Sequence, residues 1–328
     1  MSDAVEPVAP TIEETRALAA RLSPWIVRTP VVRCRNLEIA LGIDTEIWGK
    51  MEFLQQTGTF KPRGALTNLL SLDDQQLAAG ITAVSAGNHA IAASFAAKAR
   101  GASAKMVMMQ SSSPARVEAC QAYGAEVVLA RDVHEAFDVA EEIRDTEGRT
   151  YVHPFEGPNV TAGTATLGLE ICEQTGPFDA IVVPIGGGGL CSGVAAAVKQ
   201  IQPETEVIGV EPVGADSMSR SFETGRPEKL DVVDTIADSL GAPFALPHSF
   251  TICRRYVDQL VTIEDDLMRD AMGVLFHAMK MAVEPACSAS TAALAGPLRD
   301  ALAGKKVVLV FCGSNIDWPT FERHANLS

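Results

Sequence analysis

The sequence is short of positive charge. Its 328 residues contain 27 Lys and Arg against 41 Asp and Glu, which gives a formal net charge of −14. Nucleic acids and anionic membrane surfaces are held mainly by Lys and Arg side chains, so we expect neither as a partner. Net acidity instead favours solubility and suits a protein of the cytosol.

Paired cysteines and long apolar runs are missing too. The seven cysteines are scattered, none forms a CxxC pair, and no His pair has ligand spacing. A zinc site and a disulfide framework are therefore not expected, and the odd number of thiols suits a reducing compartment. No apolar run approaches the length of a membrane-spanning helix, and the acidic residues 1–22 contain no signal-peptide core. The sequence predicts a soluble, cytoplasmic protein with no membrane partner.

What the sequence does contain is an alternation of short apolar strands and helices. The predicted strands are 81–84, 104–109, 125–130, 150–154, 180–184, 206–211 and 305–312. The predicted helices are 11–22, 89–100, 114–123, 133–147, 162–175, 189–201, 264–282 and 289–303. This alternation is typical of parallel sheets covered on both faces, so the fold class is α/β. We expect two such blocks, one around 71–156 and one built from the rest, with a long surface excursion near 225–256.

Four consecutive glycines, 186–189, follow the predicted strand 180–184. Their backbone N–H groups are free to close on an anion, and the following helix adds its positive dipole. The spacing matches neither GxGxxG nor a P-loop, which favours a single phosphate group over a dinucleotide or a triphosphate. The alternative is a flexible turn without a ligand.

Two further strand ends carry small polar residues. SAGNHA follows 81–84, and its amides could hold a carboxylate while Asn88 donates to an oxygen; the alternative is an ordinary helix cap. CGSNID follows the last strand, and Cys312 there is either core filler or a functional group.

Lys61 stands between Phe60 and Pro62 in TGTFKPRGAL. A surface lysine in a turn is the ordinary interpretation. A lysine desolvated by an aromatic ring and a rigid turn, however, becomes a usable nucleophile. A reactive lysine, a cup for one phosphate, a carboxylate-type helix start and a small polar group together match the needs of pyridoxal 5′-phosphate (PLP).

These motifs resemble those of the fold-type II PLP enzymes, in particular the serine/threonine dehydratase (threonine ammonia-lyase) and serine racemase group. TGTFKPRGA is similar to that group's lysine motif, SAGNHA to its substrate loop, PIGGGGLCSG to its phosphate cup and CGSNID to its C-terminal motif. The motifs occur in the family's order, and the likeness extends from about Thr29 to Asp317.

The resemblance implies a tryptophan synthase β-like fold with two open, twisted, mostly parallel sheets, each flanked by helices. It implies a large PLP-binding domain made of 1–70 and 157–328, a small domain, 71–156, that carries the substrate loop, and a homodimer.

The resemblance also implies a role for each matching residue. Lys61 would bind the cofactor covalently, and Phe60 would pack beside its ring. The other cofactor contacts would be Asn88 at the phenolic oxygen, Cys312 opposite the ring nitrogen, and the phosphate cup of Gly186, Gly187, Gly188 and Gly189. The loop that takes the substrate carboxylate would be Ser85, Ala86, Gly87, Asn88 and His89.

Some positions depart from the family pattern. Racemases of this group have a serine as acid/base where this chain has Ala86, and alanine cannot transfer a proton. The family's site for Mg²⁺ or another divalent cation is matched by Glu211 and Ala215, but its third ligand position is Ser217, a poorer ligand than a carboxylate.

The resemblance therefore favours a carbon–oxygen lyase that converts a 3-hydroxy amino acid into a 2-oxo acid and ammonia. Lys61 would be both the anchor and the base that removes the Cα proton. The alternatives are an amino-acid racemase, a β-replacement synthase and a non-catalytic PLP-binding protein. FKPRG in this chain does not match the lysine motif of the β-replacement synthases. Serine, threonine, 3-hydroxyaspartate and larger substrates share the reacting atoms, so the sequence does not separate them. Phe137, Phe155 and Cys287 are guesses for the side-chain pocket.

Overall fold

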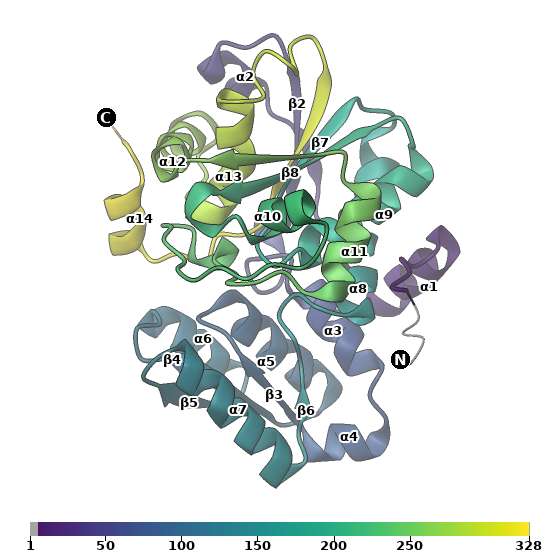
Figure 1. The fold of residues 1–328 in the computed structure, drawn as a ribbon, viewed down its shortest axis with the longest axis vertical. Helices are drawn as coiled ribbons and strands as arrows, with labels where there is room; N and C mark the ends of the chain where they lie inside the picture. Colours follow the sequence, from purple (N-terminus) through teal and green to yellow (C-terminus); the bar gives the residue numbers. More distant parts are fainter. Residues whose placement is uncertain (1–5, 328) are drawn as a thin grey trace.

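The computed structural model describes residues 6–327, which form two sheets with helices on their faces (Figure 1). The strands are β1 (Val31–Arg33), β2 (Glu46–Met51), β3 (Ile81–Val84), β4 (Ala104–Met109), β5 (Glu126–Ala130), β6 (Thr150–Tyr151), β7 (Ala180–Pro184), β8 (Glu206–Pro212), β9 (Gln259–Ile263) and β10 (Lys306–Phe311). The α-helices are α1 (Ile12–Leu22), α2 (Arg35–Leu41), α3 (Pro62–Leu70), α4 (Asp74–Ala79), α5 (Asn88–Arg100), α6 (Pro114–Ala122), α7 (Val133–Glu147), α8 (Pro158–Thr175), α9 (Gly189–Ile201), α10 (Ser217–Thr224), α11 (Pro247–Tyr256), α12 (Asp265–Met279), α13 (Pro285–Ala295) and α14 (Trp318–His324). Short 3₁₀ helices cover η1 (Glu52–Leu54), η2 (Val213–Ala215) and η3 (Asp238–Leu240).

The larger sheet has six strands in the order β1-β2-β10-β7-β8-β9. All its neighbouring strands are parallel except β1 and β2. β10 lies between β2 and β7, and its residues from Val307 to Phe311 are fully buried because helices cover both faces. Helix α13 packs on β7 and β10, and α9 packs on β7 and β8.

The smaller sheet has four parallel strands in the order β5-β4-β3-β6. Helices α5 and α7 pack against β3 and β4. Figure 1 shows this sheet below the six-stranded one, with α3 between them. The predicted α/β fold with two mostly parallel, helix-flanked sheets is confirmed. The division into a small domain, 71–156, and a large domain from the remaining residues stays a prediction.

Local signals explain several helix ends. At α1, Thr11 and Glu14 form a complete capping box, in which each side chain accepts a hydrogen bond from the other residue's backbone N–H. α5 ends at Gly101, whose φ of 69° lies in the left-handed region that glycine adopts without strain. α6 has Pro114 in its first turn, where a missing N–H costs nothing.

Other elements differ from the sequence prediction. β6 contains only two residues, because His153 and Pro154 leave the sheet to line a cavity. Strands β1, β2 and β9 were not predicted, since polar residues interrupt their apolar pattern. The stretch 225–256 was expected to be an irregular excursion, but it contains η3 and the ten-residue helix α11. Among residues 6–327, no helix is long and apolar enough to cross a lipid bilayer.

Candidate active site

Backbone pairing brings Lys61 to the end of β10. Thr59 and Gly313 form an antiparallel bridge, the Phe60 N–H donates to the Cys312 carbonyl at 3.1 Å, and the Ser314 N–H donates to the Gly58 carbonyl at 3.0 Å. Lys61 is the N-cap of α3. Two sequence motifs about 250 residues apart are thereby joined, with the lysine at the carboxyl edge of the larger sheet.

A cavity of about 220 Å³ opens at this edge. The predicted cofactor and substrate residues that line it are Phe60, Lys61, Ser85, Ala86, Gly87, Asn88, His89, Gly186, Gly187, Gly188, Gly189 and Cys312. Apart from Phe60 and Lys61, which precede α3, they follow the carboxyl ends of β3, β7 and β10, which is where open α/β sheets bind their ligands. The structure thus gathers the predicted residues in one place, while the role of each stays a prediction.

The Lys61 amine lies deep in this cavity. Its Nζ donates a hydrogen bond to the Pro154 carbonyl at 2.7 Å and stands 5.2 Å from the centre of the Phe60 ring. The Lys61 residue is half-buried and lines the cavity. Burial lowers the pKa of Lys61 to about 8, against the opposing effect of Cys312 and Glu284. An amine with this pKa is partly neutral near physiological pH and can act as a nucleophile or a base.

The four glycines between β7 and α9 make a cup that side chains would fill. A Cβ added at Gly187 or Gly189 would collide with Phe155, and Gly188 has a left-handed φ of 89°. α9 begins at Gly189, so its free N–H groups and positive dipole point into the cup. A cup of backbone donors beside a buried lysine fits the phosphate and the aldehyde of PLP.

The SAGNHA loop is held from both sides of the cavity. The Asn88 Nδ2 donates to the two Glu284 carboxylate oxygens at 2.8 and 2.9 Å, and its Oδ1 accepts from the Asn315 Nδ2 at 2.9 Å. The His89 Nε2 lies 2.8 Å from the Val152 carbonyl. Burial lowers the pKa of His89 to about 3, so the ring is neutral and its Nε2–H is the donor. The His89 side chain therefore anchors the loop to the end of β6.

Three charged residues of the cavity wall were missed by the sequence analysis, namely Arg116, Asp238 and Glu284. Glu284 is 1% exposed, and burial raises its pKa to about 7. The Arg116 guanidinium lies 3.7 Å from the Glu284 carboxylate and pairs with Asp238 at 2.5 Å. The sequence did contain a signal for Glu284, because this charged residue stands before Pro285 in a run that is otherwise small and apolar. No local pattern marks Arg116.

The rest of the wall is aromatic and apolar. Phe155 and Phe244 stand 6.1 Å apart between ring centres, and Phe137 and Met109 contribute further apolar surface. Of the three residues guessed for the side-chain pocket, Phe137 and Phe155 line the cavity and Cys287 does not. Cys287 is buried against Cys312. The Cys287 thiol and burial both raise the pKa of Cys312, so Cys312 stays a neutral thiol.

The predicted cation ligands lie elsewhere. The Glu211 carboxylate accepts hydrogen bonds from the Met218 N–H at 2.9 Å and from the Ser219 N–H and hydroxyl at 2.7 and 2.6 Å. Burial raises the pKa of Glu211 to about 7. Within residues 6–327 no group of three His, Cys, Asp or Glu side chains is placed to hold a metal. The carboxylate is thus used to cap α10, and a cation at Glu211 and Ala215 stays a prediction.

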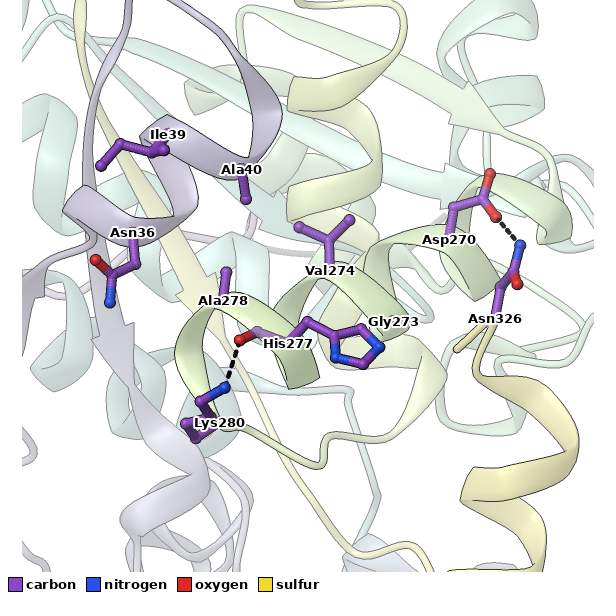
Figure 2. A pocket seen from close by; sticks show the side chains of 10 residues that line it. All are labelled: Asn36, Ile39, Ala40, Asp270, Gly273, Val274, His277, Ala278, Lys280 and Asn326. Carbon is purple, nitrogen blue, oxygen red and sulfur yellow. Dashed lines mark hydrogen bonds between the residues drawn. The ribbon is translucent and has the colours of Figure 1, made fainter. Parts of the chain in front are cut away.

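A larger hollow of about 640 Å³ lies between α2 and α12 (Figure 2). In it the Lys280 Nζ donates to the His277 carbonyl at 2.8 Å and Asn326 donates to Asp270 at 2.8 Å. None of the sequence-predicted site residues lines this hollow. The smaller cavity around Lys61 is therefore the candidate active site.

Comparison with known proteins bears on the cofactor and the reaction. Residues 22–313 match the family described as "Pyridoxal-phosphate dependent enzyme". The phenylserine dehydratase of Ralstonia pickettii is 52% identical over 318 residues, covering 97% of each chain. The L-threonine ammonia-lyase of Thermotoga maritima is 35% identical over 96% of this chain and 78% of that protein. The structure of maize serine racemase superposes with a TM-score of 0.90 at 32% identity, over 96% of this chain and 97% of that one.

Proposed function

We propose a substrate for this chain, which belongs to the pyridoxal-phosphate dependent enzyme family and is an ammonia-lyase (dehydratase) of 3-hydroxy amino acids. The preferred substrate carries an aromatic group on the 3-carbon, as phenylserine does. The observation that carries this proposal is the wall formed by Phe137, Phe155 and Phe244 in the cavity around Lys61. Such a wall fits an apolar ring, and the Arg116 guanidinium of the same cavity is already paired with Asp238 and Glu284 rather than free for a second carboxylate. The 52% identity with a phenylserine dehydratase supports the same substrate.

The chain's own residues divide the work as follows. PLP, when bound, supplies an electron sink that makes the substrate's Cα proton acidic. We assign the cofactor's covalent attachment and the removal of that proton to the Lys61 amine, whose pKa of about 8 lets it accept and release a proton near neutrality. The glycine cup, 186–189, would hold the phosphate, and Asn88 and Cys312 would contact the ring. Backbone amides of 85–89 would hold the substrate carboxylate.

Elimination is favoured over racemisation at this site. Racemisation needs a proton donor on the face of the cofactor opposite Lys61, and the loop residue there by resemblance is Ala86, which lines the cavity with a methyl group. Elimination needs no donor on that face, since the proton that one base removes from Cα can be passed to the hydroxyl, which leaves as water. Hydrolysis of the remaining enamine then takes up one water and releases ammonia. The products would be a 2-oxo acid and ammonia.

We further propose that the protein works as a homodimer in the cytoplasm. All seven cysteines are free and buried, as suits a reducing compartment. Val32 on β1 and Ile39 on α2 are 41% and 79% exposed and offer apolar surface for a second copy. Light scattering on the purified protein would give twice the chain mass of 34.7 kDa; a monomer at working concentration would contradict the dimer.

The function is tested on the purified holoenzyme with a substrate panel. We expect an absorbance band at about 410 nm, absent in Lys61→Ala, as is typical of PLP bound to a lysine. Threo- and erythro-phenylserine, threonine, serine and 3-hydroxyaspartate are then assayed for 2-oxo acid and ammonia. The aromatic substrate should have the highest kcat/KM. A protein without the band, even after PLP is added, would overturn the role of Lys61, and a preference for serine or 3-hydroxyaspartate would overturn the aromatic substrate.

A further inference from the structure

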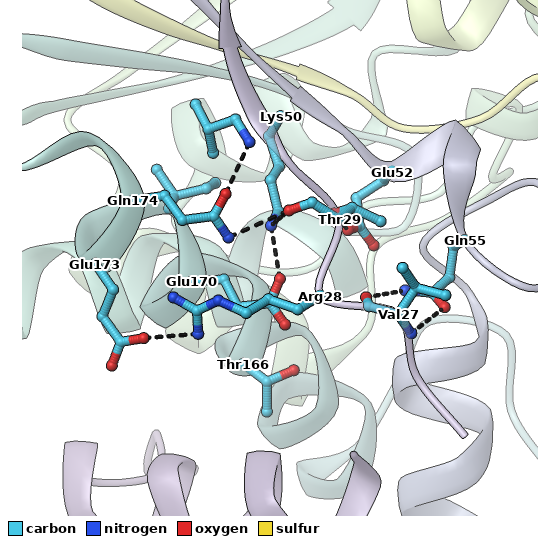
Figure 3. Close-up of polar contacts among 12 residues, drawn as sticks. Val27, Arg28, Thr29, Lys50, Glu52, Gln55, Thr166, Glu170, Glu173 and Gln174 are labelled. Carbon is cyan, nitrogen blue, oxygen red and sulfur yellow. Dashed lines mark hydrogen bonds and ion pairs between the residues drawn. The ribbon is translucent and has the colours of Figure 1, made fainter. Parts of the chain in front are cut away.

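Four charged side chains are buried together just outside the cavity. They are Lys50 on β2, Glu52 in η1, Arg63 on α3 and Glu170 on α8, and we call them the buried ionic cluster. Their side chains are 0, 0, 1 and 9% exposed. None of them lines the cavity around Lys61. Figure 3 shows Lys50, Glu52 and Glu170 converging from their separate elements.

Arg63 is the centre of this cluster. Its Nε and Nη2 donate to the two Glu52 oxygens at 2.8 and 2.9 Å. Its Nη1 and Nη2 donate to the two Glu170 oxygens, both at 2.9 Å, and Nη1 also donates to the Thr166 hydroxyl at 3.0 Å. The guanidinium therefore makes five hydrogen bonds and grips two carboxylates, an arrangement that the single ammonium of a lysine cannot reproduce.

The cluster is balanced in charge. Lys50 donates to the Glu170 carboxylate at 2.6 Å and to the Thr29 carbonyl at 2.7 Å, and the Thr29 hydroxyl donates to Glu52. Burial alone would lower the pKa of Arg63, but Glu52 and Glu170 outweigh it and raise that pKa, so the residue stays charged. Buried ion pairs often add little net stability over apolar residues of the same volume, because desolvation offsets the attraction. Such a cluster instead fixes the relative positions of the backbone segments that carry its side chains.

The geometry that Arg63 fixes is the first turn of α3. The Arg63 N–H donates to the Phe60 carbonyl at 3.1 Å, and the Ala65 N–H donates to the Lys61 carbonyl at 3.1 Å. From the other side, α8 approaches so closely that a Cβ at Gly163 would collide with the Arg63 carbonyl. The backbone that carries Lys61 is therefore held by a side chain two residues away, which is itself held by η1 and α8.

We propose that Arg63 is a positioning residue for the reaction, and that the buried ionic cluster sets the place of the Lys61 amine in the cavity. This inference rests on the proposed role of Lys61. A base must meet its proton at hydrogen-bond distance, and a misplacement of about 1 Å can lower a rate by roughly 100-fold. The cluster thus acts on the chemistry through the backbone, without touching substrate or cofactor.

The test compares Arg63→Lys with a control that weakens the fold elsewhere. Met272→Ala serves as the control, because Met272 is buried with Phe321 and does not line the cavity. For each holoenzyme we measure Tm, the PLP dissociation constant, the pH dependence of the band at about 410 nm, and kcat and KM for phenylserine. In Arg63→Lys we expect kcat to fall roughly 10- to 100-fold with little change in KM, together with weaker PLP binding and a shifted pH midpoint of the band.

A milder variant guards against a protein that fails to fold. Thr166→Val removes one hydrogen bond to the Arg63 Nη1 and leaves both carboxylates in place, so its effects should have the same direction and be smaller. The variants are compared at an equal decrease in Tm. If Arg63→Lys and Thr166→Val then have the same pH midpoint, PLP affinity and kcat as Met272→Ala, the cluster is only structural and the inference is wrong. A wild-type protein that lacks the band would instead contradict the proposed function itself.

Discussion

At the residue scale, the environment of one amine decides when the enzyme can load its cofactor. The Lys61 Nζ is buried beside the Phe60 ring, and burial is the largest cause that lowers its pKa to about 8. Only the neutral amine attacks an aldehyde, so a lowered pKa makes the lysine reactive at a pH where surface lysines are almost fully protonated.

We therefore predict that the rate of PLP uptake by the cofactor-free protein rises with pH and levels off above about 8. Stopped-flow absorbance at about 410 nm measures this rate. Since the Glu284 carboxylate raises the pKa of Lys61, Glu284→Gln should move the midpoint to lower pH. A rate that keeps rising toward pH 10.5, the ordinary lysine value, would show that the amine is not desolvated.

Substrate choice is also decided by single side chains. Phe137→Ala should raise KM for phenylserine by roughly 10-fold and change KM for serine by less than about 2-fold, because only the larger substrate reaches the aromatic wall. Phe95→Ala is the matched control, since Phe95 packs against Tyr123 outside the cavity. Equal effects of Phe137→Ala on both substrates would remove Phe137 from the specificity pocket.

At the element scale, the turn between β7 and α9 depends on the absence of side chains. A Cβ at Gly187 would meet the Phe155 ring, so the ring and the turn that is expected to hold the phosphate would have to shift apart. We predict that Gly187→Ala folds but binds PLP at least about 100-fold more weakly, a loss of roughly 2.7 kcal/mol, measured by fluorescence titration.

The control for this variant is Gly148→Ala at the end of α7. Gly148 has a φ of 65°, and a Cβ there meets nothing within 4 Å, so the change strains the backbone without filling a site. Its PLP affinity should equal that of the wild type. If Gly187→Ala also binds PLP normally, the four glycines are only a turn.

The same scale shows what the sequence could and could not predict. Strands such as β7 and β10 were predicted correctly because continuous burial leaves an unbroken apolar run. β2 was missed because Lys50 lies inside it, and the charge of that buried lysine is balanced by Glu170 on α8. A polar residue whose partner lies 120 positions away looks exposed in a one-dimensional pattern.

At the scale of the whole molecule, the two sheets meet at the mouth of the cavity through polar contacts. The Arg116 guanidinium, on α6 beside the smaller sheet, pairs with Asp238 and donates to the Asn315 carbonyl at 2.9 and 3.1 Å. Ser113 donates to Asp317 at 2.8 Å in the same place. A joint of this kind can open and close more easily than an apolar core.

We predict that Arg116→Gln loosens this joint without unfolding either sheet. Amides of 313–317 and 238–241 should exchange hydrogen roughly tenfold faster, which corresponds to about 1.4 kcal/mol. Mass spectrometry of peptides from these segments measures the exchange. Arg131→Gln is the control, because its ion pair with Glu135 lies on the open surface and should have no effect on either segment. Unchanged exchange in Arg116→Gln would show that other contacts hold the joint.

Sequence motifs predicted those residues of the site that belong to short local patterns. Lys61, the loop 85–89, the glycines 186–189 and Cys312 each sit in a short pattern, and all of them line the cavity. Arg116, Asp238 and Glu284 come from three separate segments and meet only because the two sheets face each other. Their contribution depends on tertiary structure, which no local spacing encodes.

The position of β10 has a consequence for the order in which the protein can be made. β10 lies between β2 and β7, yet it is the last strand to be synthesised. While a ribosome is still translating the chain, the smaller sheet has all four of its strands by Tyr151, whereas the larger sheet lacks its middle until Phe311 has emerged. Until then β2 can pair only with β1, and β7 only with β8, so the edges of β2 and β7 that face β10 in the folded protein have no partner. Such open strand edges are natural targets for chaperones.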